Sequence, residues 1–203
     1  MKQIDESLPK LMRDSSNTDG KAEIVMDYIM SWCLRRAANS CDHDAKPVLR
    51  KYCRYMLGLL LNKHLTDDII AEDVNIKKQY LKIDLWVEVT LKLDDKIEYH
   101  TILIENKYYT LLHNSNDEEG VSRNQLEVYK NKFDNYYKEQ LDGNKWIKHY
   151  NLVTCIERDN STFDSYKIAE TFGFNIFSFD ELLITTTEAT ESDIFNEFWL
   201  RSW

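Results

Sequence analysis

The segment from Leu81 to Lys107 reads LKIDLWVEVTLKLDDKIEYHTILIENK and decides the fold. In its first part, apolar side chains occupy every second position from Ile83 to Leu91, with polar or aromatic ones between them. Such alternation is typical of a β-strand. Asp94-Asp95-Lys96 then provides a turn, and residues 98–109 resume the strand pattern. The segment therefore predicts a β-hairpin.

This hairpin brings three charged side chains together. With the turn centred near Asp95, residues that face each other have numbers summing to about 190, so Asp84 lies opposite the end of the second strand. Glu105 and Lys107 are two residues apart on that strand and share one face of the sheet. We therefore expect two carboxylates and an ammonium to lie close together, beside the apolar residues 102–104.

Charges in a buried strand need partners, and two arrangements would supply them. In the first, Lys107 forms a structural ion pair with a carboxylate. In the second, a divalent cation, which prefers hard oxygen ligands, binds Asp84, Glu105 and a nearby backbone carbonyl. The pairing geometry alone leaves both arrangements open.

Helical and strand patterns continue on both sides of the hairpin. Apolar spacing predicts an N-terminal α-hairpin over residues 21–38 and 47–61. After the hairpin, the pattern predicts helices over 121–140, 163–172 and from 181 and 192, and strands over 149–156 and 174–179. This order implies an α/β protein whose mixed central sheet is flanked by helices on both faces. We expect one domain over 1–203, with a polar lead-in at 1–20, the N-terminal helices at 21–64 and a catalytic core at 74–180.

Composition excludes several classes of protein. The chain has 203 residues, of which 43% are hydrophobic and 30% charged, so it can bury a core and is not a disordered chain. Its apolar stretches are too short to span a membrane, and its N-terminus has no apolar signal segment. A net charge of −9 argues against coating of nucleic acid or membrane by the whole surface. We therefore expect a cytoplasmic protein without a membrane partner.

The four cysteines fit a reducing compartment, and none of them forms a Cys-x-x-Cys pair. Cys33, Cys41, His43 and Cys53 can be drawn as a zinc set. Cys33 and Cys53, however, fall on apolar helical positions, which favours buried thiols.

A local basic stretch is compatible with the acidic total. Arg50, Lys51 and Arg54 fall on one side of the helix predicted over 47–61, and Arg123 extends the basic stretch on the helix after the hairpin. These cations form either a solvated helix face or a set of contacts to a phosphate backbone.

Gln125 and Tyr129 are four residues apart and share a face of the helix that follows the hairpin. Asp84, then Glu105-Asn106-Lys107, then Gln125-x-x-x-Tyr129 resembles the PD-(D/E)XK nuclease superfamily. The resemblance is closest to the branch that shares the Q-x-x-x-Y helix with RecB-like nucleases. Residues 102–107 are similar to the I-E-N-K strand of many uncharacterised bacterial members.

Two further positions bear on this resemblance. Glu23 resembles the glutamate that opens the first helix of that branch, although Glu72 competes for the same place. Ile83 stands before Asp84, where the family often has a proline.

The resemblance implies a restriction-endonuclease-like fold and a Mg²⁺-dependent nuclease that hydrolyses phosphodiester bonds, with DNA as the expected substrate. It implies that Asp84, Glu105 and the Asn106 carbonyl hold Mg²⁺ or Mn²⁺, with Glu23 as a further ligand.

The same resemblance gives roles to the remaining residues. Lys107 would hold the attacking water, with a pKa lowered by the cation and the apolar strand. Gln125 would orient the water or the lysine, and Tyr129 would reach a phosphate or Glu105.

Two other classes of protein stay open. One is a catalytically inactive module with the nuclease fold that binds nucleic acid or protein. The other is a plain interaction domain with an internal lysine–carboxylate bridge. The oligomeric state is also open, a homodimer included.

Overall fold

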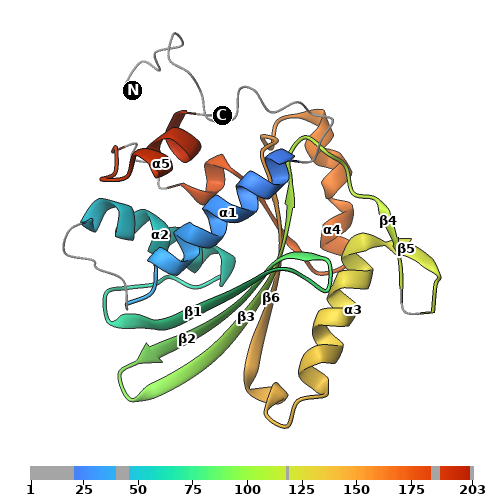
Figure 1. The fold of residues 1–203 in the computed structure, drawn as a ribbon, viewed down its shortest axis with the longest axis horizontal. Coiled ribbons are helices and arrows are strands. Elements are labelled where there is room, and N and C mark those ends of the chain that lie inside the picture. The colour runs from blue at the N-terminus through green and yellow to red at the C-terminus, as the bar shows by residue number, and fades with distance from the viewer. Residues whose placement is uncertain (1–20, 40–45, 118, 184–187, 202–203) are drawn as a thin grey trace.

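Five strands form one mixed sheet in the order β1-β2-β3-β6-β7 (Figure 1). The strands are β1 (Ile69–Tyr80), β2 (Ile83–Leu93), β3 (Lys96–Lys107), β6 (Trp146–Thr154) and β7 (Asn175–Ser178). The first three run antiparallel as a meander, whereas β6 and β7 are added parallel to β3. This computed structural model describes residues 21–39, 46–117, 119–183 and 188–201, so the polar lead-in expected at 1–20 lies outside the described residues.

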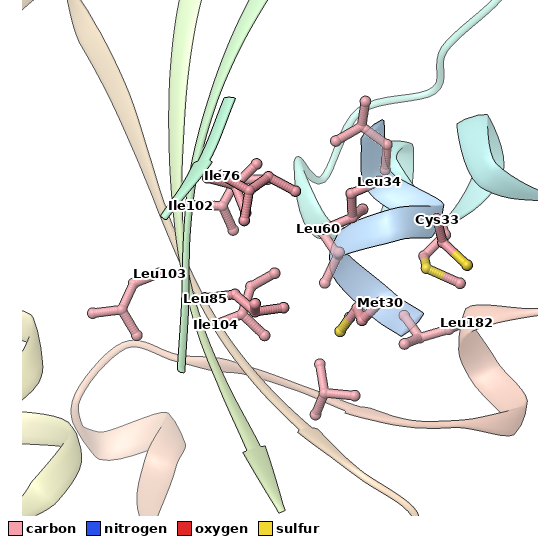
Figure 2. Close-up of a cluster of buried hydrophobic side chains, with 14 of the residues drawn as sticks. Met30, Cys33, Leu34, Leu60, Ile76, Leu85, Ile102, Leu103, Ile104 and Leu182 are labelled. Carbon is pink, nitrogen blue, oxygen red and sulfur yellow. The ribbon is translucent and has the colours of Figure 1, made fainter. Parts of the chain in front are cut away.

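Helices cover both faces of this sheet. α1 (Lys21–Arg36) and α2 (Pro47–Leu60) lie on one face, and α3 (Gln125–Lys138) lies on the other (Figure 1). Figure 2 shows Met30 and Leu60 turned toward Leu85 and Ile104, whereas Leu103 points to the opposite side of the sheet. The mixed α/β architecture with an N-terminal α-hairpin is therefore confirmed.

The predicted hairpin lies inside the sheet as β2 and β3. Leu85 pairs with Ile104, which is within the register expected from the turn. Leu85 and Trp86 point to opposite faces, and both are 0% exposed because helices cover both sides. On the α3 side, Trp86 Nε1 donates a hydrogen bond to the Tyr137 hydroxyl at 2.9 Å.

β1 is a strand that the sequence pattern did not separate from β2. The turn between them, Leu81-Lys82, contains no glycine, asparagine or proline, yet its φ angles are 54° and 72°. Two-residue hairpin loops need this left-handed backbone, which glycine or asparagine normally supplies. The usual turn signal is therefore missing from the sequence. β1 pairs with the outer side of β2 and makes both hairpin strands interior.

Several later elements are shorter than the pattern predicted, although β6 begins earlier than expected, at Trp146. The helix expected over 121–140 begins at Gln125, because β5 (Ser122–Asn124) pairs with β4 (Asn114–Asn116) just before it. Asn124 caps the helix by accepting a hydrogen bond from the Leu126 N–H at 3.0 Å. The remaining short elements are three 3₁₀ helices (Gly143–Lys145, Ser161–Tyr166 and Asp180–Leu182), α4 (Ile168–Thr171), α5 (Asp193–Phe195) and a π-helical segment (Asn196–Arg201).

Core side chains from α1 to the C-terminal segment form one hydrophobic cluster. Cys33 and Cys53 are buried in it, as expected for thiols on apolar helical positions, while Cys41 and His43 lie outside the described residues. None of the helices that the structure describes has the length and apolar content that crossing a membrane requires.

Candidate functional site

Asp84, Glu105 and Lys107 meet at the carboxyl-terminal end of β3. The β2–β3 register puts Asp84 across from Glu105, and Lys107 Nζ lies 2.8 Å from Glu105 Oε1. Glu105 and Lys107 are 3% and 4% exposed. Asp84 Oδ2 accepts a hydrogen bond from the backbone N–H of Asn106 at 2.8 Å, which ties this carboxylate to the same strand end. The structure thus brings together the three charges that the sequence placed opposite one another.

Glu105 is more deeply buried than Asp84. Burial, followed by the charge of Asp84, raises its pKa well above the ordinary value, although Lys107 acts in the other direction. Lys107 and the Gln125 side-chain amide both donate to Oε1. Oε2 is buried and has no hydrogen-bond partner among the described residues. A buried carboxylate oxygen without a donor costs free energy, and a cation would remove that cost.

The pKa of Lys107 is set by burial and by its carboxylate partner. Burial acts to lower it, but the charge of Glu105 and the hydrogen bond between the two side chains outweigh burial, so the pKa is raised. The lowering expected from the sequence depends on a bound cation and stays a prediction, whereas the carboxylate 2.8 Å away acts in the opposite direction. Lys107 is therefore a firmly protonated donor here.

The first turn of α3 supplies Gln125 and Tyr129. Gln125 is fully buried, donates to Glu105 and accepts a hydrogen bond from the His113 backbone N–H at 3.0 Å. Tyr129 is 6% exposed. Burial, and then the negative charges of Glu105 and Asp84, raise the pKa of Tyr129 to about 12. Both residues thus belong to the same group as the two carboxylates.

α1 contributes a further carboxylate. Glu23 Oε1 accepts hydrogen bonds from the Tyr108 backbone N–H at 3.1 Å and from the Thr110 hydroxyl. Its charge also acts on Glu105 and Lys107. Glu72, the competing candidate, is exposed on β1. Of the two glutamates, Glu23 is therefore the one that lies near the site.

Two residues that sequence reasoning missed complete a ring of hydrogen bonds around Asp84. Asp27 accepts from the Asn106 side-chain amide at 2.7 Å and from the Gln79 amide at 3.0 Å. Gln79 Nε2 also lies 2.8 Å from Asp84 Oδ1, and the Asn106 N–H closes the ring on Oδ2. Burial, and then the charge of Asp84, raise the pKa of Asp27 to about 7. The i, i+4 spacing of Glu23 and Asp27 on α1 is the sequence signal that would have identified Asp27.

Oxygen donors at this point suit a small hard cation. The Cys155 N–H donates to the Lys107 carbonyl at 3.3 Å, so the backbone groups of Lys107 face β6. Because the peptide groups of successive strand residues alternate in direction, the Asn106 carbonyl is expected on the side of β2, where the Asn106 N–H donates to Asp84. The described residues contain no set of three His, Cys, Asp or Glu side chains arranged for a metal. Two carboxylates and one carbonyl, with water for the other positions, nevertheless match what Mg²⁺ and Mn²⁺ use.

Similarity to other proteins adds nothing to this geometry. Comparisons with protein-family models, curated proteins and solved structures found no match.

The predicted basic residues fall in different environments. Arg54 is 7% exposed and donates to the Thr66 and Ile69 carbonyls at 2.8 Å each, which corrects its place on an exposed basic face. It is buried because the segment after α2 folds back over its guanidinium. Lys51 is exposed, and Arg50 is half-buried.

Arg123 lies apart from the α2 cations, on the small β4–β5 sheet. Its guanidinium forms ion pairs with Asp117 at 2.7 Å and with Glu127 at 3.2 Å. Much of its charge is thus already balanced by two carboxylates.

Proposed function

We propose that this protein is a Mg²⁺-dependent nuclease that hydrolyses phosphodiester bonds, with DNA as its expected substrate, as the resemblance to the PD-(D/E)XK superfamily implies. The observation that carries the proposal is the buried Glu105 Oε2, which has no donor among the described residues although Asp84 and Glu23 add negative charge around it. Such a carboxylate favours the binding of a metal cation from solution in addition to Lys107.

Asp84, Glu105 and the Asn106 carbonyl would hold Mg²⁺ or Mn²⁺, with Glu23 as a further ligand. When bound, the ion polarises the phosphodiester and makes a bound water more acidic. Lys107, a protonated donor beside Glu105, stabilises the negative charge that develops on the phosphate oxygens. This role suits a raised pKa better than proton abstraction does.

α3 would position these groups for the reaction. Gln125 holds Glu105 Oε1 through its amide, so it fixes the carboxylate relative to Lys107. Tyr129 keeps its proton at neutral pH, because its pKa is about 12, and can donate to a phosphate oxygen.

Lys51 and Arg123 are the proposed contacts to the nucleic-acid backbone, whereas Arg50 is half-buried and lines a pocket beside α2. Lys51 is exposed and therefore available to phosphate. Arg123 would have to exchange its partners Asp117 and Glu127 for phosphate, so we expect it to contribute less. We place the activity in the cytoplasm, since Cys33 and Cys155 remain buried thiols.

One observation favours the two alternatives without catalysis, the inactive binding module and the interaction domain with an internal lysine–carboxylate bridge. The Lys107–Glu105 pair is closed at 2.8 Å and buried, as a structural ion pair would be. In that case the group would stabilise the fold without binding metal.

Cleavage assays separate the two functions. Purified protein is incubated with plasmid, linear duplex DNA, single-stranded DNA and RNA, each with Mg²⁺, with Mn²⁺ or with EDTA. We expect cleavage of DNA that requires metal and is absent from the Glu105→Gln variant, which should still bind substrate. Binding without cleavage of any substrate in either metal would overturn the proposed nuclease and support the inactive module.

A further inference from the structure

A separate pocket of about 830 Å³ opens beside α2. α2, the segment that follows it as far as Asp67, and Phe177 on β7 form its walls. The residues of the candidate metal site are not among those that line it. Pockets of roughly 300–1,000 Å³ enclose small organic ligands, so this one has room for a ligand of that class.

One wall of this pocket is positively charged. Arg50 and Arg54 lie one helical turn apart on α2, with Lys51 beside them, whereas Asp67 is the only acidic residue among the described residues that form the pocket. Among the ion pairs of the described residues, none involves Arg50, Lys51 or Arg54. The wall therefore carries positive charge that nearby carboxylates leave largely uncompensated.

Two features indicate that the positive charge of the arginines is only partly compensated, although Asp67 acts on Arg54 and Arg50 donates to the Asn39 side chain at 3.4 Å. Burial, and then the charge of Arg50, lower the pKa of Arg54, so the two guanidinium groups repel each other. Arg50 Nε is buried and has no hydrogen-bond partner among the described residues. An anion in the pocket would supply both the missing acceptor and the missing charge.

The rest of the lining is aromatic and aliphatic. Tyr55 is 37% exposed and Phe177 is half-buried, and Leu59 and Leu65 line the same space. Aromatic faces of this kind stack on flat rings, and base–aromatic stacking contributes about 1–3 kcal/mol per base. The pocket thus offers an apolar, aromatic surface next to a cationic one.

We propose that this pocket binds a mononucleotide-like ligand, in which a phosphate monoester contacts the arginines and a planar ring lies against the aromatic side chains. A phosphate monoester, with a charge of about −1.5 to −2 at neutral pH, balances three cations better than a single carboxylate does. Duplex DNA suits the pocket less well, since Arg54 is recessed and a duplex backbone contacts cations on an open surface. The inference goes beyond the proposed nuclease and does not depend on it.

Calorimetric titration at low salt tests this proposal with AMP, GMP, CMP and UMP as probes and with adenosine and inorganic phosphate as fragments. We expect at least one nucleotide to bind, and each fragment to bind about tenfold or more weakly than AMP. Arg50→Gln should weaken nucleotide binding about tenfold, and Tyr55→Ala several-fold. Lys138→Gln, which removes an exposed lysine on α3, is the matched control and should leave binding unchanged. Arg54 is not substituted, because its hydrogen bonds to Thr66 and Ile69 support the fold.

Glu105→Gln separates this pocket from the candidate metal site, because nucleotide binding should persist in that variant. Binding that is lost with Glu105→Gln but kept with Arg50→Gln would place the ligand at the metal site and overturn the proposal. It would equally be overturned if no nucleotide bound at millimolar concentration. The same holds if only DNA oligonucleotides bound in an Arg50-dependent manner, which would assign the pocket to the nucleic-acid backbone.

Discussion

The two ends of β3 each carry a glutamate with a lysine beside it, but they differ in how the carboxylate is satisfied. At the amino-terminal end, Glu98 accepts from Lys63 at 2.6 Å, from Lys96 at 2.9 Å and contacts His100 at 3.1 Å. These donors, Lys63 first, lower the pKa of Glu98 to about 2. At the carboxyl-terminal end, both donors of Glu105 converge on one oxygen, and its pKa is raised.

This difference teaches how to tell a structural charge cluster from an incomplete one. Around Glu98, cations outnumber carboxylates and both oxygens have donors. Around Glu105, Asp84 and Glu23 add negative charge that Lys107 alone has to balance. The charge of a carboxylate such as Glu98 is already balanced by its donors. A carboxylate such as Glu105 would be stabilised further by a bound cation.

The largest expected effect on the cleavage rate comes from removing the charge of Glu105, at the carboxyl-terminal end of β3, and not that of Glu98 at the other end. If the proposed nuclease is correct, Glu105→Gln should reduce metal-dependent DNA cleavage by on the order of 10³-fold or more, because it would remove a proposed metal ligand and the partner of Lys107. Glu98→Gln, the same substitution on the same strand, should leave the rate unchanged. Initial rates on plasmid DNA at saturating Mg²⁺ measure both variants. Equal rates for the two variants would contradict the comparison.

The ring of hydrogen bonds around Asp84 should matter for metal binding more than for the fold. Gln79→Ala removes the amide that joins Asp27 to Asp84, so the Mg²⁺ concentration for half-maximal cleavage should rise about tenfold, as it does for residues that orient metal ligands. A Mg²⁺ titration of the cleavage rate measures this shift. If Gln79→Ala only lowered the unfolding temperature and left the titration midpoint in place, its role would be structural.

Metal should also stabilise the Glu98→Gln and Glu105→Gln variants differently. At a Mg²⁺ or Mn²⁺ concentration of a hundred times the Kd, the free energy of unfolding should rise by about 2.7 kcal/mol in the wild type and in Glu98→Gln. Glu105→Gln should lose most of this gain. Thermal unfolding with metal and with EDTA provides the measurement. An equal metal-induced shift in all three proteins would remove Glu105 from the metal site.

Without metal, Glu98→Gln and Glu105→Gln should change the free energy of unfolding in opposite directions. Glu98→Gln weakens hydrogen bonds to two lysines and should lower the free energy of unfolding by about 1–2 kcal/mol. Glu105→Gln removes a carboxylate whose charged form burial and Asp84 disfavour, while Asp84 and Glu23 still act on Lys107, so it should raise this free energy. Urea unfolding at pH 7 in EDTA decides the signs, and two losses of similar size would mean that both glutamates are structural.

The smallest expected effect is a pH dependence at the amino-terminal end. Burial, and then the charge of His100, lower the pKa of His149 to about 4. His149 therefore binds a proton near pH 6.5 in the unfolded chain but only near pH 4 in the folded protein. Its contribution to the free energy of unfolding is fully present above pH 6.5 and is lost as the pH falls toward 4. His149→Gln should remove about 1 kcal/mol of this fall in urea unfolding, because the ring is partly exposed. An unchanged slope would show that His149 is not its source.

The hairpin and its charges were predictable because their causes are local. Alternation and one turn set the register that puts Asp84 across from Glu105, and residue spacing puts Lys107 and Glu105 on one face. Gln125 could be placed because its helix is the first one after β3 in the sequence.

Other features of the site could not be predicted because they depend on contacts between segments that are far apart in the sequence. Asp27 meets Asn106 only because α1 packs across the end of β3, and Arg54 is buried only because the segment after α2 turns back over it. β1 was missed for a local reason, since Leu81-Lys82 forms a left-handed turn without the residues that normally announce one.

The mixed topology of the sheet also implies an order of assembly. β1, β2 and β3 are joined by short turns, whereas β6 reaches β3 only after the long connection of residues 108–145, which includes α3. Closing short loops costs less chain entropy, so the meander should form before the parallel crossover. Asp84, Glu105 and Lys107 would then come together in the first stage of folding. Gln125 and Tyr129 would join them only when the crossover docks, so a folding intermediate that lacks α3 would already carry the acidic half of the site.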